Sequence, residues 1–173
     1  MKLKNILLPL CTIIITALVL TGCSNNSGEK IGTNVGDKAP DFSITTIDGQ
    51  KYELSDFKGK ILIVTSTASW CPTCFIEAEE LAKVYPKFKD KGVEILSVSI
   101  DPTDNDELLE KFKKDYDTPW LYTHPNRAKQ MIIDNGLTRF EITYVIDQNG
   151  VIQYKDSGIT LARQIATILE ELT

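Results

Sequence analysis

The sequence has little of what metal centres and nucleic-acid interfaces are built from. It contains one histidine, His124, and four cysteines in 173 residues. A structural zinc site takes four ligands, and only one closely spaced pair, Cys71 and Cys74, is present. The formal net charge is −5 and no tract rich in lysine or arginine stands out, which argues against a nucleic-acid partner. No internal repeat is visible either.

The N-terminus reads as an export signal. Two lysines in "MKLKN" precede the apolar run of residues 6–20, and small residues follow. A permanent membrane span is the alternative, because the run is nearly long enough. The end of the run, Leu20-Thr21-Gly22-Cys23, resembles the lipobox of prokaryotic lipoproteins. That resemblance implies a signal peptide of residues 1–22, lipidation of Cys23, and attachment to the extracytoplasmic face of the cell membrane.

Residues 24–34 are polar and rich in glycine, serine and asparagine. This composition predicts a flexible tether over residues 23–34, between the lipid and a folded domain at 35–173. Cys11 would leave with the signal peptide, so Cys71 and Cys74 are the only cysteines of the domain. Outside the cytoplasm a disulfide between them can persist.

The domain alternates strand and helix patterns. Apolar and polar residues alternate around Asp48-Gly49, which predicts a β-hairpin over residues 41–57. Runs rich in β-branched residues predict buried strands, and apolar residues at helical spacing predict helices. Strands are expected at 60–67, 93–100, 120–124 and in a strand-turn-strand at 141–158, and helices at 72–92, 102–117, 125–136 and 160–172. The order predicts an α/β fold: a mixed sheet with helices on both faces and an N-terminal hairpin.

The segment "TASWCPTCFIE" carries the chemistry. Cys71 lies between an expected strand and an expected helix, where the helix N-terminus favours a thiolate. Cys74 lies one turn along, so the two sulfurs can form a disulfide. We expect Cys71 to be the more exposed, attacking sulfur and Cys74 the buried, resolving one. A purely structural disulfide is the alternative, although it would close a loop too small to restrict the unfolded chain much.

The residues "VTSTASWCPTC" after a buried strand resemble the thioredoxin superfamily. The lipoprotein signal and the opening "KAPDFSITTIDGQKYELSDFKGK" resemble its extracytoplasmic TlpA/ResA branch, which is related to the AhpC/TSA peroxiredoxins. The resemblance covers about residue 35 to the C-terminus. It implies a thioredoxin-like fold and a thiol-disulfide oxidoreductase that exchanges electrons with extracytoplasmic protein dithiols and disulfides, as a reductant. We expect a monomer without an organic cofactor or bound metal.

The resemblance also assigns roles to residues. Cys71 matches the nucleophile and Cys74 the resolving thiol of a redox-active disulfide. Trp70 matches an aromatic residue beside the site, and Pro72 and Thr73 shape it between the cysteines. Glu77 matches an acid that tunes thiol protonation in ResA-like members. A solvated residue that suits the helix dipole is the alternative for Glu77.

One position departs from the family. A cis-proline normally faces the dithiol before a late strand, and here Glu141 stands at that position, between Phe140 and Ile142. A trans peptide bond is expected there, because a cis bond before a residue other than proline costs about 2.5–4 kcal/mol. Glu141 either faces the cysteines, where its charge would oppose thiolate formation, or points to solvent.

Two other functions of this fold remain as alternatives. A peroxiredoxin-like thiol peroxidase would have a Pro-x-x-x-Thr-x-x-Cys pattern; Ala68 stands three residues before Cys71 instead, although Arg139 lies near the expected active-site arginine. A Sco-like copper-binding module would have Cys-x-x-x-Cys and a histidine before the late strand. Here the cysteine spacing is shorter and His124 lies well upstream.

Overall fold

The central sheet is built from the β-branched runs of the sequence. The computed structural model describes residues 29–173, and its five-stranded sheet has the order β5-β4-β3-β6-β7. The strands are β3 (Ile61–Thr67), β4 (Val93–Ser99), β5 (Leu121–Thr123), β6 (Ile142–Ile146) and β7 (Ile152–Ser157). β3 pairs parallel with β4 and antiparallel with β6. The sheet is therefore mixed, as predicted.

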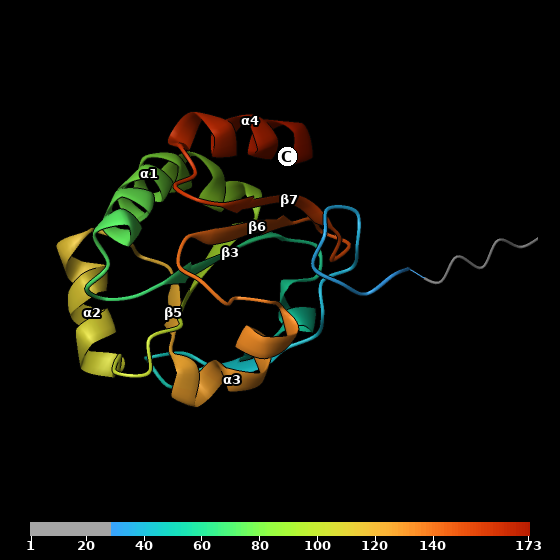
Figure 1. The fold of residues 1–173 in the computed structure, drawn as a ribbon. Helices are drawn as coiled ribbons and strands as arrows, with labels where there is room; N and C mark the ends of the chain where they lie inside the picture. The colour runs from blue at the N-terminus through green and yellow to red at the C-terminus, as the bar shows by residue number, and fades with distance from the viewer. Residues whose placement is uncertain (1–28) are drawn as a thin grey trace, which may run out of the picture.

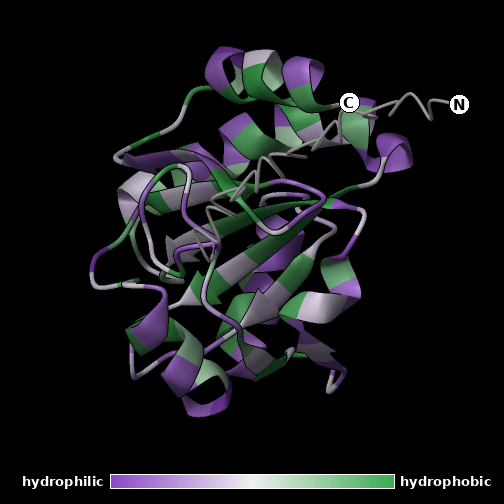
Figure 2. Cartoon of the chain, turned by 90° about the vertical axis from the view of Figure 1, so that its right-hand side faces the viewer, coloured by the Kyte–Doolittle hydropathy of each residue, from purple (hydrophilic) through white to green (hydrophobic). Residues whose placement is uncertain are grey.

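Both faces of the sheet are covered, which is why β3 is buried along its whole length. The helices are α1 (Pro72–Phe88), α2 (Asp106–Asp115), α3 (Pro125–Asp134) and α4 (Ala162–Leu172). Ile61 and Ile63 pack on the side of α1, α2 and α4, whereas Leu62 and Val64 pack on the side of α3 and the N-terminal hairpin. Figure 1 shows α1 and α4 above the sheet and α3 below it. Hydrophobic residues concentrate on the central strands between them (Figure 2).

The N-terminal hairpin forms a second, two-stranded sheet of β1 (Ser43–Thr45) and β2 (Lys51–Glu53), followed by a 3-10 turn, η1 (Leu54–Phe57). Gly49 allows the tight turn, because its φ of 83° lies in the left-handed region that glycine adopts without strain. Phe42, Ile44 and Phe57 are buried against the sheet. The hairpin extension is therefore part of the hydrophobic core of the domain.

The helix ends follow local capping. Helix α1 begins at Pro72, which needs no N–H partner in the first turn. It ends at Phe88, followed by a 3-10 turn, η2 (Lys89–Lys91), and Gly92 in the left-handed region. Helix α2 begins at Asp106 rather than at residue 102, because the Asn105 side chain accepts the backbone N–H of Leu108 and caps the helix there. Residues 101–104 are consequently a loop.

The first described residues contact the domain. The N–H of Gly32 donates to the carbonyl of Lys38 at 2.9 Å, and Lys30 pairs with Asp37. The predicted signal peptide and Cys23 lie outside the described residues, so the boundaries at 22 and 34 stay predictions. Within residues 29–173 no helix has both the length and the apolar character needed to cross a membrane.

Candidate active site

The cysteine pair lies where β3 passes into α1. Cys71 caps the helix and Cys74 lies in its first turn, and the two form a disulfide with their Cα atoms 5.2 Å apart. Both are buried, with 3% of Cys71 and 2% of Cys74 exposed. The expected difference in exposure is absent, because both cysteines belong to one buried cluster with Ala68, against which Phe140 packs. Access to Cys71 therefore depends on the residues around it.

The helix start favours negative charge on Cys71. Its sulfur accepts the backbone N–H of Cys74 at 3.3 Å, and the unpaired N–H groups of the first turn add a positive potential. After reduction this environment stabilises a thiolate on Cys71. Pro72 and Thr73, between the cysteines, are exposed, and the Thr73 hydroxyl lies 3.3 Å from the Cys71 sulfur.

Glu77 is buried behind the pair, with 2% of the residue exposed. The hydroxyls of Thr65 and Thr143 donate to its two carboxylate oxygens at 3.1 and 2.6 Å. Burial raises the pKa of Glu77 to about 7, partly offset by these hydrogen bonds and reinforced by the charge of Glu141. The alternative of a solvated residue does not hold. Glu77 and Cys74 line the same small pocket, so a carboxyl with a near-neutral pKa lies in the neighbourhood of Cys74.

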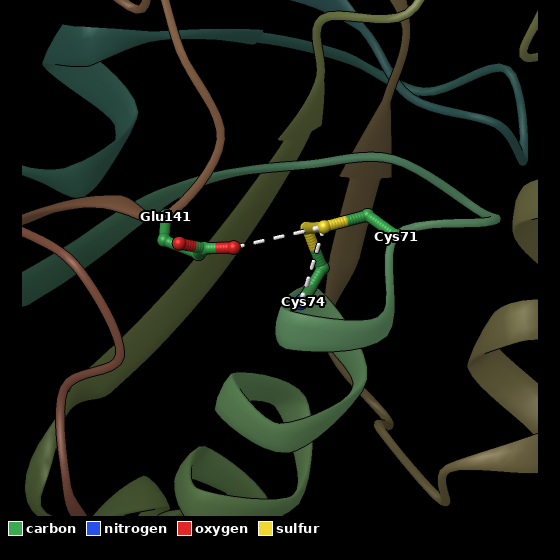
Figure 3. A group of neighbouring side chains, drawn as sticks. All are labelled: Cys71, Cys74 and Glu141. Carbon is green, nitrogen blue, oxygen red and sulfur yellow. Dashed lines mark hydrogen bonds between the residues drawn. A yellow bond between two sulfur atoms is a disulfide. The ribbon is translucent and has the colours of Figure 1, made fainter.

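Glu141 faces the disulfide. Its carboxylate oxygen Oε1 lies 3.7 Å from the Cys71 sulfur (Figure 3). The same oxygen accepts a hydrogen bond from the Thr73 hydroxyl. Of the two orientations open from the sequence, the one toward the cysteines is present. The peptide bond is trans, as predicted, and Glu141 takes a φ of 59°, the left-handed region that residues other than glycine seldom adopt.

Ser66 holds this unusual backbone. Its carbonyl accepts the N–H of Glu141 at 3.0 Å, while its hydroxyl donates to the Arg139 carbonyl at 2.7 Å and accepts the N–H of Ile142 at 2.9 Å. Ser66 is completely buried in β3. Three hydrogen bonds from one residue thus fix the segment that carries Glu141. Sequence reasoning missed Ser66, because nothing local marks it as a partner of residues more than seventy positions away.

Trp70 forms the exposed rim of the site. It is 56% exposed and meets Phe140 edge-on, with ring centroids 5.5 Å apart. Its indole N–H donates to Asp101 at 2.7 Å. An exposed tryptophan fixed by two contacts can present a rigid apolar surface to a partner. Phe140 is half-buried and Ile142 is buried, so the exposed part of the predicted site surface consists of Trp70 and Phe140 together with Pro72 and Thr73.

The loop at residues 101–104 holds Trp70 and its neighbour Ser69 through hydrogen bonds. Asp104, 2% exposed, accepts the backbone N–H of Ser69 at 3.0 Å as well as the hydroxyls of Ser69 and Ser99. The sequence predicted a helix from residue 102 that would include Asp104, and that was wrong. The physical reason is the cap at Asn105, which leaves Asp104 outside the helix and free to turn inward.

The residues of the rival functions lie elsewhere. Arg139 donates to the carbonyl of Ser157 at 3.1 Å. His124 is the N-cap residue directly before α3, and its Nε2 lies 3.1 Å from Asp106. Within residues 29–173, His124 does not belong to the group of ligand-type side chains around the disulfide. Neither the arginine of a peroxidase nor the histidine of a copper site is therefore brought to the cysteines.

Comparison with known proteins agrees with this geometry. The model of the AhpC/TSA family matches residues 35–155. The thiol-disulfide oxidoreductase ResA of Bacillus thuringiensis subsp. konkukian is 31% identical over 139 residues, which cover 80% of this chain and 79% of that protein. ResA of Bacillus anthracis is 27% identical over 166 residues, covering 92% of this chain and 94% of the relative.

A solved structure, the thioredoxin domain of a thiol-disulfide oxidoreductase from Bacteroides vulgatus, superposes with a TM-score of 0.68 at 25% identity. The match covers 80% of this chain and 96% of that one. The fold is therefore thioredoxin-like. With a family model matched over most of the domain and ResA relatives aligned along it, the chain belongs to the AhpC/TSA family as a ResA-like member of the thioredoxin superfamily.

Proposed function

We propose that this chain is a membrane-anchored reductant of disulfides in extracytoplasmic proteins, acting through Cys71 and Cys74. The observation that carries the proposal is the disulfide at the N-terminus of α1, between a buried carboxyl with a pKa of about 7 and the carboxylate of Glu141. The chain is a thioredoxin-like oxidoreductase, because relatives of that class align with four-fifths of it and its cysteine pair lies at the helix start of a thioredoxin fold.

The first step uses the reduced form. The Cys71 thiolate attacks one sulfur of a partner disulfide, so that a mixed disulfide forms and the partner's other sulfur leaves as a thiolate, which takes a proton from solvent. The N–H of Cys74 and the dipole of α1 support the charge on Cys71. Trp70 and Phe140 offer the apolar surface on which the partner rests.

The second step releases the partner. Cys74 loses its proton and attacks the Cys71 sulfur, so the internal disulfide forms again and the partner's second sulfur leaves as a thiolate. Glu77 is suited to take the proton of Cys74, because a carboxyl with a pKa of about 7 is in part ionised at neutral pH. In sum, the protein's dithiol becomes a disulfide and the partner's disulfide becomes a dithiol.

The charges around the pair support the reducing direction. A dithiol is a weak reductant when its thiolate is strongly stabilised, since the reduced form is then favoured. Here Glu141 places a negative charge 3.7 Å from Cys71 and Glu77 lies buried beyond Cys74. A negative charge on either carboxyl group disfavours thiolates at the cysteines and so favours the disulfide over the reduced pair. The reduced protein is therefore a better electron donor. The predicted export signal and the predicted lipidation of Cys23 support action at the outer face of a membrane.

Trapping tests the proposal. In Cys74→Ala the mixed disulfide between Cys71 and a partner cannot be resolved, so partner proteins should stay linked to the full chain and separate on adding a thiol reductant. Cys71→Ala is the matched control and should capture far fewer partners. If the two variants capture the same proteins in equal amounts, the assigned roles are wrong.

A further inference from the structure

The cysteines and Glu141 together form a set of three potential metal ligands. The two sulfurs and a carboxylate oxygen of Glu141 all lie within 4.8 Å of one another, the only such group of three in residues 29–173 (Figure 3). We propose that reduction of the disulfide turns this group into a zinc site, with Cys71, Cys74 and Glu141 as its three protein ligands.

The distances suit zinc. Bond lengths of about 2.3 Å to sulfur and 2.0–2.2 Å to oxygen, at tetrahedral angles, place neighbouring ligand atoms about 3.5–3.8 Å apart. The Glu141 oxygen already lies 3.7 Å from the Cys71 sulfur. Once the sulfur–sulfur bond is broken, the two sulfurs need only separate to a similar distance. The fourth position is left for water.

The carboxylate is held in place for this role. The Thr73 hydroxyl donates to the same oxygen that faces Cys71, and a hydrogen-bonded carboxylate is the usual form of a metal ligand. The backbone of Glu141 is fixed by Ser66 in the left-handed region. Because residues other than glycine adopt such a conformation only where the surrounding structure holds them in it, its presence at this point indicates a local requirement.

The donor set selects the metal. Two thiolates and a carboxylate carry three negative charges, which a divalent cation offsets better than a monovalent one. Zinc accepts both sulfur and carboxylate oxygen, whereas copper(I) selects the soft thiolates. Removal of the Glu141 carboxylate should therefore weaken zinc binding but leave copper(I) binding nearly unchanged. From the sequence alone Glu141, 67 residues after Cys74, could face either the cysteines or solvent; the structure brings it to the two sulfurs.

The disulfide must be reduced before zinc can bind. A thiol reductant gives two electrons and two protons to the disulfide and is itself oxidised to a disulfide. Zinc then displaces the two protons from Cys71 and Cys74 into solvent. With both sulfurs bound to zinc, neither can attack a partner disulfide, so zinc would hold the reduced protein inactive until the metal is removed.

Zinc titration tests the proposal. The full chain is reduced with a phosphine in oxygen-free, metal-free buffer, and zinc is titrated in competition with a coloured chelator. The reduced chain should bind one zinc ion and the oxidised chain none. Glu141→Gln should bind at least about tenfold more weakly and Thr73→Ala about tenfold more weakly, the loss usual for an outer partner of a metal ligand. Glu79→Gln, which removes an exposed charge from helix α1, should bind zinc like the wild type.

Cobalt(II) provides a second readout, since thiolate ligation gives a sulfur-to-cobalt charge-transfer band that the oxidised chain should lack. The proposal is overturned if the reduced chain binds zinc no better than the oxidised chain, or if Glu141→Gln binds as tightly as the wild type. It also fails if zinc does not bind and copper(I) binds equally well to the reduced wild type and to reduced Glu141→Gln. The proposal requires only that the pair can be reduced. If the pair equilibrates with thiol buffers yet zinc does not bind, the zinc site alone is refuted and the oxidoreductase function stands.

Discussion

Replacing Glu77 by glutamine should remove a pH dependence of stability that the buried carboxyl creates. Glutamine has nearly the same shape, and the hydroxyls of Thr65 and Thr143 can accept or donate hydrogen bonds as its amide requires. What changes is the charge. In the wild type, burial disfavours the ionised carboxylate and raises the pKa of Glu77 from an ordinary 4.5 to about 7.

The sign and size follow from linkage. Below pH 4.5 Glu77 is protonated in both the folded and the unfolded chain, so it contributes no pH dependence to the free energy of unfolding. Between pH 4.5 and 7 unfolding releases a proton, so the free energy of unfolding falls as the pH rises. Above pH 7 the loss is complete, and at 1.36 kcal/mol per pKa unit it amounts to about 3 kcal/mol.

Urea unfolding of the oxidised full chain between pH 4 and pH 8.5 measures this effect without titration of the thiols. The stability of Glu77→Gln relative to the wild type should increase by about 3 kcal/mol from the acidic to the basic end. Glu79→Gln removes an exposed charge from the same helix and should leave the wild-type profile unchanged. If the profiles of Glu77→Gln and the wild type run parallel, the account of a buried, near-neutral carboxyl is refuted.

Three further changes test the surroundings of the dithiol. In Glu141→Gln, iodoacetamide should alkylate reduced Cys71 about sixfold faster at neutral pH, because a charge at 3.7 Å opposes the thiolate by about 1 kcal/mol even at the dielectric constant of water; an unchanged rate would place the charge elsewhere. Ser66→Ala should lower the free energy of unfolding by about 1–3 kcal/mol in urea titrations, since the N–H of Ile142 loses its partner. Trp70→Ala should raise the KM for reduction of a protein disulfide such as insulin but leave that for a small aromatic disulfide nearly unchanged, and equal effects on both would argue against a partner surface.

The order of helices and strands could be predicted because the signals are local. The β-branched runs that became β3 and β4 and the apolar spacing of α1 are contained in short windows. The position of Cys71 at the helix start followed from the strand before it and Pro72 after it. The hairpin turn at Gly49 is likewise marked by its own residues.

The environment of the dithiol could not be predicted in this way, because its contacts join distant segments. Glu77 is buried by threonines of β3 and β6, one of them 66 positions away. Whether Glu141 faces the cysteines depends on Ser66, which has no distinctive sequence signal. Asp104 turned inward only because Asn105 capped the helix after it. The signal peptide and lipidation of Cys23 stay predictions.

The central claim, that Cys71 and Cys74 are a reversible redox pair, is tested most directly by equilibrating the full chain in glutathione and dithiothreitol buffers of defined ratio and counting alkylated thiols. The account predicts that both thiols appear together in one two-electron transition, with the protein still folded, and that dithiothreitol reduces the pair more readily than glutathione. A pair that stays oxidised in every folded sample, or that is reduced only when the protein unfolds, would contradict the account and leave the disulfide a structural bond.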